Sequence, residues 1–185
     1  MPKSPPPLPG KTLARVLALS RANAWSVTAV AGLSTVAALA QAHWATAGFG
    51  VLATLAGLLE LRGQARLRRD DARGLRGMIG AQFLLLAVGW AYAWFRWRHF
   101  DADALWSELP AFSQAQVTSQ MQAADLDPEI DRPLLLRLMN IIVCVTLVLV
   151  TFVYQGGLAL YYAAKSGVIR AALASSPVHS EPHRP

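Results

Sequence analysis

Three long stretches of the sequence carry no charged side chain, and they constrain the fold more than any other feature. They cover residues 22–59, in which His43 is counted as neutral, residues 78–95 and residues 138–164. A helix needs about 20 apolar residues to cross the hydrocarbon core of a bilayer. The second and third stretches therefore predict one membrane span each, and the first predicts two spans joined by a tight turn.

The predicted fold is all-α: an integral membrane protein with a bundle of four transmembrane helices and a short helical extracytoplasmic loop. Only 15% of the residues are charged, whereas a soluble domain usually carries about 25%. We place the spans at residues 22–41, 45–61, 77–95 and 138–164, and the loop at residues 98–137. In this loop, Asp103 and Ser113 are expected to cap short helices, and Pro128 to begin another.

Three segments follow from this placement. Residues 1–21 are expected to form a cytoplasmic Pro-rich tail and an interfacial helix, which either lies in the interface or continues into the first span. Residues 22–164 form the transmembrane domain, and residues 165–185 form a cytoplasmic polar tail.

Basic residues are distributed unequally between the two predicted sides of the membrane. The N-terminal segment, the 62–77 loop and the C-terminal tail hold 13 of the 17 Lys and Arg residues, and the opposite side holds the other four with seven carboxylates. Cytoplasmic loops carry an excess of Lys and Arg. Both termini are therefore predicted to be cytoplasmic. The abundance of Arg, Ala, Leu and Gly is typical of a GC-rich bacterial genome, which indicates a bacterial inner membrane.

Five arginines of the 62–77 segment recur at steps of four and three residues: Arg62, Arg66, Arg69, Arg73 and Arg76. On a helix that extends beyond the membrane they form one basic stripe. Such a stripe predicts contact with anionic phospholipid headgroups or with an acidic partner. The alternative is that these arginines only fix the topology. Nucleic-acid binding is not expected, because no aromatic residues interleave the run.

Small residues line one face of the second predicted span, at Gly50, Ala53 and Gly57. Lipid tails supply no hydrophobic drive between helices, so transmembrane helices associate where small side chains let their backbones approach closely. This face therefore predicts a tight hairpin of the first two spans. Self-association of two chains is the alternative use of the same face.

Polar residues recur along one side of the fourth predicted span: Asn140, Cys144, Thr151, Gln155 and Tyr162. Polar groups are costly in hydrocarbon, so this side is expected to face protein or water. Interhelical hydrogen bonding is the first interpretation, and a water-lined pathway is the alternative. The pair Gly156–Gly157 is expected to loosen the helix there, because glycine is a poor helix former.

The titratable residues near the membrane are few. Glu60 lies near Arg62 at the cytoplasmic end of the second span, and we interpret it as an interface residue, although an acid inside a membrane is a functional candidate by default. His43 and His99 lie near the outer boundary and can hold a metal or haem only if their rings face each other. The sequence contains no catalytic motif, so no enzymatic activity, cofactor or metal is expected.

The expected function is that of a small multi-pass inner-membrane protein, an accessory or scaffold subunit or a self-associating structural protein, within a homo-oligomer or a larger membrane complex. A homo-oligomeric channel or small transporter, whose pore is lined by the polar side of the fourth span, is the alternative. A haem or metal carrier that uses His43 and His99 is the third candidate.

The topology predicts which cysteines are accessible from outside intact cells. In a Cys144→Ser background, Ser113→Cys lies in the predicted extracytoplasmic loop, and a membrane-impermeant thiol reagent is expected to label it in intact cells. Ala65→Cys, in the predicted cytoplasmic loop, serves as the control and is expected to react only after permeabilisation. The opposite pattern would show that the orientation is inverted.

Overall fold

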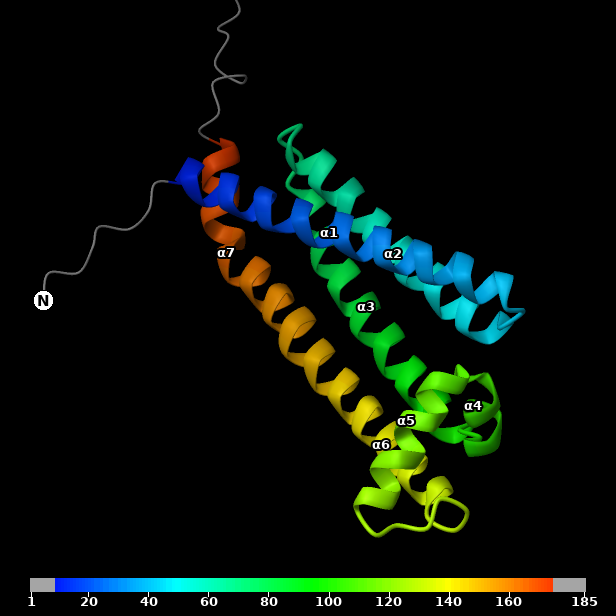
Figure 1. Ribbon diagram of the computed structural model, residues 1–185. Helices are drawn as coiled ribbons and strands as arrows, with labels where there is room; N and C mark the ends of the chain where they lie inside the picture. Colours follow the sequence, from blue (N-terminus) through cyan, green and yellow to red (C-terminus); the bar gives the residue numbers. More distant parts are fainter. Residues whose placement is uncertain (1–8, 175–185) are drawn as a thin grey trace, which may run out of the picture. The chain divides into compact units, whose positions relative to one another are not determined.

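The chain is described by a computed structural model in which residues 9–174 are placed. The other residues include most of the Pro-rich tail and of the polar C-terminal tail, so the predictions for these tails lie outside the described part. The helices are α1 (Pro9–Ala40), α2 (Trp44–Leu67), α3 (Arg73–Arg98), α4 (Ala102–Glu108), α5 (Ala111–Ala123), α6 (Arg132–Thr151), the π-helical turn η1 (Phe152–Gly156) and α7 (Gly157–Ala174) (Figure 1).

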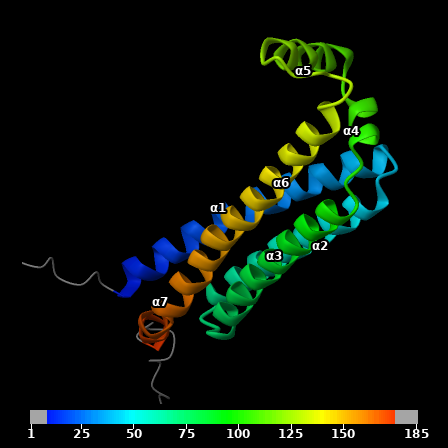
Figure 2. The same ribbon diagram turned by 90° about the horizontal axis from the view of Figure 1, so that it is seen from below.

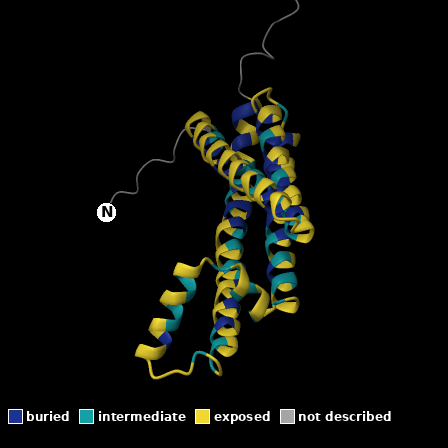
Figure 3. Ribbon diagram, turned by 45° about the vertical axis from the view of Figure 1, so that its right-hand side comes forward, coloured by how far each residue is buried: buried dark blue, intermediate teal, exposed yellow. Residues whose placement is uncertain are grey.

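Four helical runs are long and apolar enough to cross a membrane: α1, α2, α3 and the run from Arg132 to Ala174. The prediction of an all-α chain with four such helices is confirmed. Only a minority of the residues along these helices are buried (Figure 3), and the exposed residues include many large apolar side chains, such as Val30, Leu33 and Leu149. An exposed apolar surface of this extent suggests a multi-pass membrane protein.

The described residues divide into two compact units. The first unit contains α1, α2, the part of α3 up to Val88, and the chain from Thr151 onwards, which includes η1 and α7. The second unit runs from Gly89 to Val150 and contains the end of α3, the short helices α4 and α5, and nearly all of α6.

Helix α1 is longer than predicted, because the N-terminal segment and the first span form one continuous helix. It has 32 residues, which corresponds to about 48 Å of helix. It ends at a turn in which Ala42 adopts a positive φ of 57°, and α2 returns beside it (Figures 1 and 2). The tight turn between the first two predicted spans is thus present.

The arginine-rich segment does not form the single helical stripe that its spacing predicted. Helix α2 ends at Leu67 and α3 begins at Arg73, with a turn between them in which Asp70 has a φ of 59°. The five arginines are exposed but fall on the two helices and on the turn. The aspartate in the left-handed region explains the break, because Asp and Asn tolerate this conformation better than other side chains.

The loop between α3 and α6 begins its helices at other residues than those predicted. Asp101 caps α4, since its Oδ1 accepts hydrogen bonds from the backbone N–H groups of Asp103 and Ala104 at 2.9 and 3.2 Å. Helix α5 starts directly after Pro110 rather than at Ser113. Pro128 lies in a turn closed by Asp131, whose backbone N–H donates to the Asp127 carbonyl at 2.8 Å, so the next helix starts only at Arg132.

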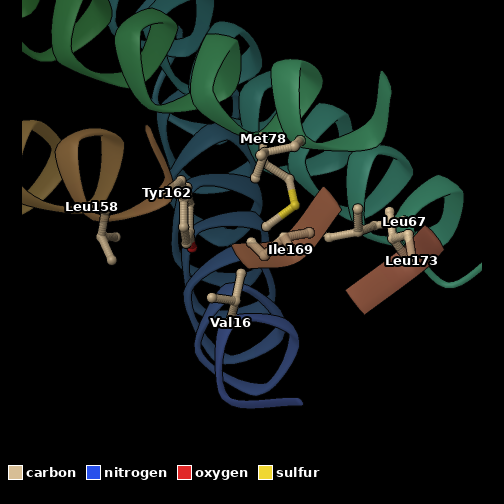
Figure 4. Packing of buried hydrophobic residues seen from close by; sticks show 8 residues of the cluster. Val16, Leu67, Met78, Leu158, Tyr162, Ile169 and Leu173 are labelled. Carbon is tan, nitrogen blue, oxygen red and sulfur yellow. The ribbon is translucent and has the colours of Figure 1, made fainter. Parts of the chain in front are cut away.

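The buried apolar side chains of the first unit gather where α1, α2, α3 and α7 meet (Figure 4). The cluster contains Val16 of α1, Leu67 of α2, Met78 of α3 and Ile169 of α7, each at most 1% exposed. The N-terminal part of α1 therefore packs against α7. Periodicity alone could not predict this contact, because the two helices lie far apart in the sequence.

Glycines allow α2 to approach its neighbours closely. A Cβ atom on Gly57 would overlap the Thr28 hydroxyl and lie 3.3 Å from the Ala24 carbonyl oxygen, and one on Gly50 would overlap the Thr35 hydroxyl. Ala53, between them, is half-buried. A second close contact joins α2 to α3, where a Cβ on Gly63 would lie 2.8 Å from the carbonyl oxygen of Gly74.

The contact at Gly57 predicts that Gly57→Leu destabilises the first unit. A leucine there must separate α1 from α2, and overpacking of this kind costs about 1–3 kcal/mol. Gly48→Leu is the matched control, because it lies on the same helix with nothing within 4 Å of its Cβ position. Thermal unfolding in detergent measures both. Equal losses for the two variants would mean that α1 does not pack on this face.

Candidate functional site

Glu60 lies inside the first unit, one to two turns before the end of α2. Its side chain is 0% exposed, so the interpretation of Glu60 as an interface residue is wrong. Three elements cover this end of α2: the N-terminal extension of α1, the start of α3, and α7. None of these packing partners was visible in the sequence around Glu60 itself.

The Glu60 carboxylate accepts hydrogen bonds from three side chains on two other helices. Ser20 Oγ donates to Oε1 at 3.0 Å, and Asn23 Nδ2 donates to Oε2 at 2.6 Å. These two residues are three positions apart on α1 and therefore share one face. From α7, Tyr162 Oη donates to Oε1 at 3.1 Å. One carboxylate thus connects α1, α2 and α7.

All three donors are neutral groups, and all three residues are buried. Burying an ionised carboxylate costs a large amount of free energy unless hydrogen bonds or an opposite charge compensate for the lost hydration. Here hydrogen bonds supply the compensation. The arrangement resembles an anion site more than an ion pair, because the donors satisfy a negative oxygen without neutralising it.

The side chain of Gln82 on α3 lies near the Glu60 carboxylate, but it does not form a hydrogen bond with it. The Gln82 side chain is fully buried, and neither its Nε2 nor its Oε1 has a hydrogen-bond partner among the described residues. A buried amide without partners is rare. Gln82 therefore offers an unused NH2 group and an unused carbonyl oxygen beside the carboxylate.

These groups can accommodate both protonation states of Glu60. An ionised carboxylate only accepts hydrogen bonds, whereas a protonated one also needs an acceptor for its O–H. The hydroxyl groups of Ser20 and Tyr162 can rotate to accept, and Gln82 Oε1 is a further acceptor. The site is therefore chemically suited to hold a proton reversibly.

The polar residues of the fourth predicted span are divided between the two units. Asn140 and Cys144 are buried in the second unit, and Gln155 and Tyr162 are buried in the first, where Thr151 is half-buried. Arg96 Nε donates to Asn140 Oδ1 at 2.8 Å, which is the kind of interhelical hydrogen bond that the first interpretation predicted. The use of these residues as a pore lining stays a prediction.

The helix is π-helical at Phe152–Gly156, so the turn ends within the glycine pair that was expected to loosen the helix. Gln155 lies in this turn, is buried, and has an Oε1 atom without a partner among the described residues. A π-turn shifts the following residues around the helix axis. The side of the helix on which Tyr162 lies is therefore set by the turn as well as by the sequence spacing.

The two histidines lie in different units, His43 before α2 and His99 after α3. The His99 ring stacks on Phe95, with centroids 4.5 Å apart. Within residues 9–174 no group of three or more His, Cys, Asp or Glu side chains is arranged to hold a metal ion. A bis-histidine site stays a prediction.

The second unit has an apolar groove of about 720 Å³ between the end of α3 and α6. It is lined by Trp90, Trp94, Trp97, Cys144, Val148 and other apolar residues. Polar side chains that would orient a ligand do not converge on it, so it offers less specific chemistry than the Glu60 site.

Comparison of the chain with protein-family models, with curated proteins and with solved structures found no match.

Proposed function

We propose that the protein is a small multi-pass membrane protein that works by binding and releasing a proton at Glu60. The observation that carries the proposal is the complete burial of this carboxylate among Ser20, Asn23 and Tyr162. A glutamine would fill the same space without the cost of burying a charge, and its single carbonyl oxygen could still accept from Ser20 and Tyr162. An acid in a membrane-spanning helix is best explained by a role that needs its proton.

Protonation changes how three helices are held together. In the ionised state, Glu60 of α2 accepts from Ser20 and Asn23 of α1 and from Tyr162 of α7. Hydrogen bonds to a charged acceptor are stronger than those to a neutral one. On protonation these bonds weaken, and one hydroxyl or the Gln82 amide must reorient to accept the new O–H. The packing of α1 and α7 on α2 therefore depends on proton binding.

A packing change of this kind suits the accessory role that the sequence predicts. An accessory subunit in a bacterial inner membrane transmits its state to a partner through the surfaces of its helices. We infer that the protein is such a proton-responsive subunit, in a homo-oligomer or a larger membrane complex. The channel alternative receives less support, because Asn140 and Tyr162 of the last helical run hydrogen-bond to other helices.

Infrared difference spectroscopy of the protein in bilayers tests proton binding at Glu60. We expect acidification to produce the carbonyl band of a protonated carboxyl group in a dry environment, and Glu60→Gln to remove this band. Glu129→Gln is the matched control, because Glu129 is an exposed acid of the loop, and its loss is expected to leave the band unchanged. The proposal fails if the wild-type protein and Glu60→Gln give the same difference spectrum.

The Tyr162 hydroxyl provides a second test with a definite sign. Tyr162→Phe removes one donor, which is expected to cost about 1.5–3 kcal/mol when the acceptor is charged and about 0.5–1.5 kcal/mol when it is neutral. The destabilisation is thus expected to be larger at a pH where Glu60 is ionised than at one where it is protonated. Tyr161→Phe, on the neighbouring residue, serves as the control. A loss that does not vary with pH would contradict the proposal.

A further inference from the structure

We propose that a groove at the start of α1 and the end of α2 binds the phosphate headgroup of an anionic phospholipid. This headgroup groove has a volume of about 690 Å³ and is lined by Arg21, Trp25 and Arg68 together with small apolar residues, among them Ala14, Ala18 and Ala22. All of these residues belong to the first unit. The site is independent of the proton chemistry of Glu60.

The three alanines lie at intervals of four residues on α1 and therefore on one face of the helix. Their short side chains leave a hollow with an apolar floor. Gln64 of α2 donates a hydrogen bond from Nε2 to the Leu17 carbonyl oxygen at 2.5 Å. This bond ties the end of α2 to the middle of the hollow, and it places Arg68, at the C-cap of α2, in the lining of the groove.

Two positive charges line the groove. Arg21 and Arg68 are exposed, and neither takes part in an ion pair within the described residues. The planar guanidinium group binds phosphate oxygens in a bidentate manner, which makes arginine the preferred residue for phosphate recognition. The two side chains come from different helices, so together they can grip one phosphate from two directions.

The position of the groove along α1 matches the boundary of a membrane. The charge-free stretch of the sequence begins directly after Arg21, and Trp25, 58% exposed, lies one turn further into it. Tryptophan is enriched at this level of a bilayer, with arginine at the headgroups above it. A phospholipid fits this order, with its phosphate at the arginines and the start of its acyl chains along Ala22 and Trp25.

The predicted topology places this end of the bundle on the cytoplasmic side, where anionic lipids attract basic residues. A free phosphate ion would use the arginines but gain nothing from the apolar floor or from Trp25. The combination of charge and apolar surface therefore favours a lipid over an inorganic anion as the ligand.

Native mass spectrometry of the purified full-length chain tests the site, with phosphatidylglycerol and phosphatidylcholine added in mild detergent. We expect the wild-type protein to retain one phosphatidylglycerol in preference to phosphatidylcholine. The double variant Arg21→Gln/Arg68→Gln is expected to bind it roughly 30-fold more weakly, because each arginine near an anionic headgroup contributes a factor of about five to the affinity. Retention of phosphatidylglycerol by this variant at the wild-type level would overturn the proposal.

Two further variants separate a built groove from general attraction to basic residues. Lys11→Gln/Arg170→Gln removes two exposed charges of the first unit outside the groove and is expected to keep the bound lipid. Ala18→Trp fills the groove without changing the charge and is expected to lose it. Equal losses in the two charge variants, or normal binding by Ala18→Trp, would show that no specific groove exists.

A third arm distinguishes the source of the phosphate. Inorganic phosphate added to the protein with bound phosphatidylglycerol is expected to leave the lipid in place. Displacement of the lipid by phosphate would overturn the assignment to a lipid. The infrared band of Glu60 serves as an internal check, because Arg21→Gln/Arg68→Gln is expected to leave it unchanged. Failure of the wild-type protein to retain phosphatidylglycerol, with the Glu60 band present, then counts against the headgroup groove alone and leaves the proton proposal standing.

Discussion

The approach of α1 to α2 at Gly57 is the contact on which the buried carboxylate depends. Gly57 lies one turn from Glu60 along α2, and it meets Ala24 and Thr28 of α1. Serine and asparagine have short side chains, so Ser20 and Asn23 reach the Glu60 oxygens only if the two backbones are close. The packing of small residues and the burial of the acid are therefore parts of one arrangement. A wider separation of α1 and α2 would leave the acid without two of its three donors.

The same arrangement explains why α7 packs against the N-terminal part of α1. Tyr162 completes the set of donors from α7, and the apolar cluster with Val16 and Ile169 seals that end of the unit. Hydrogen bonds in a membrane protein add modestly to stability one by one, but an unpaired carboxylate in the same place would cost far more. The hydrogen bonds of Glu60 and the apolar cluster together therefore determine which helices assemble as well as how tightly they do so.

The sequence predicted the four long apolar helices well, because the absence of charge is a local property that does not depend on which helices pack together. It also predicted Gly50 and Gly57 as packing residues, since a small residue at helical spacing has one main use in a bilayer. The burial of Glu60 was missed, because it depends on the continuation of α1 upstream of the first predicted span and on Tyr162, which lies 102 positions away in the sequence. The closeness of Glu60 to Arg62 in the sequence favoured a position for Glu60 at the boundary of the membrane.

Other differences have similar causes. The arginine stripe required one helix, and the turn at Asp70 divides the arginines between two. Ser20, Asn23 and Gln82 carried no signal of their own, because isolated polar residues in a helix are common. A polar pair three residues apart at the start of a charge-free stretch, opposite a lone acid on the next apolar helix, is the pattern that would have indicated the site.

The central claim is that one carboxylate connects α1, α2 and α7 and exchanges a proton there. Solid-state NMR of the labelled protein in bilayers measures this most directly, through contacts and shifts of the Glu60 Cδ, Asn23 Cγ and Tyr162 Cζ carbons. The account predicts cross-peaks from Glu60 to both partners, and signals of all three that change together in one titration as the pH is varied. A Glu60 carboxyl that shows no contact with Tyr162 and titrates together with the exposed Glu129 would contradict it.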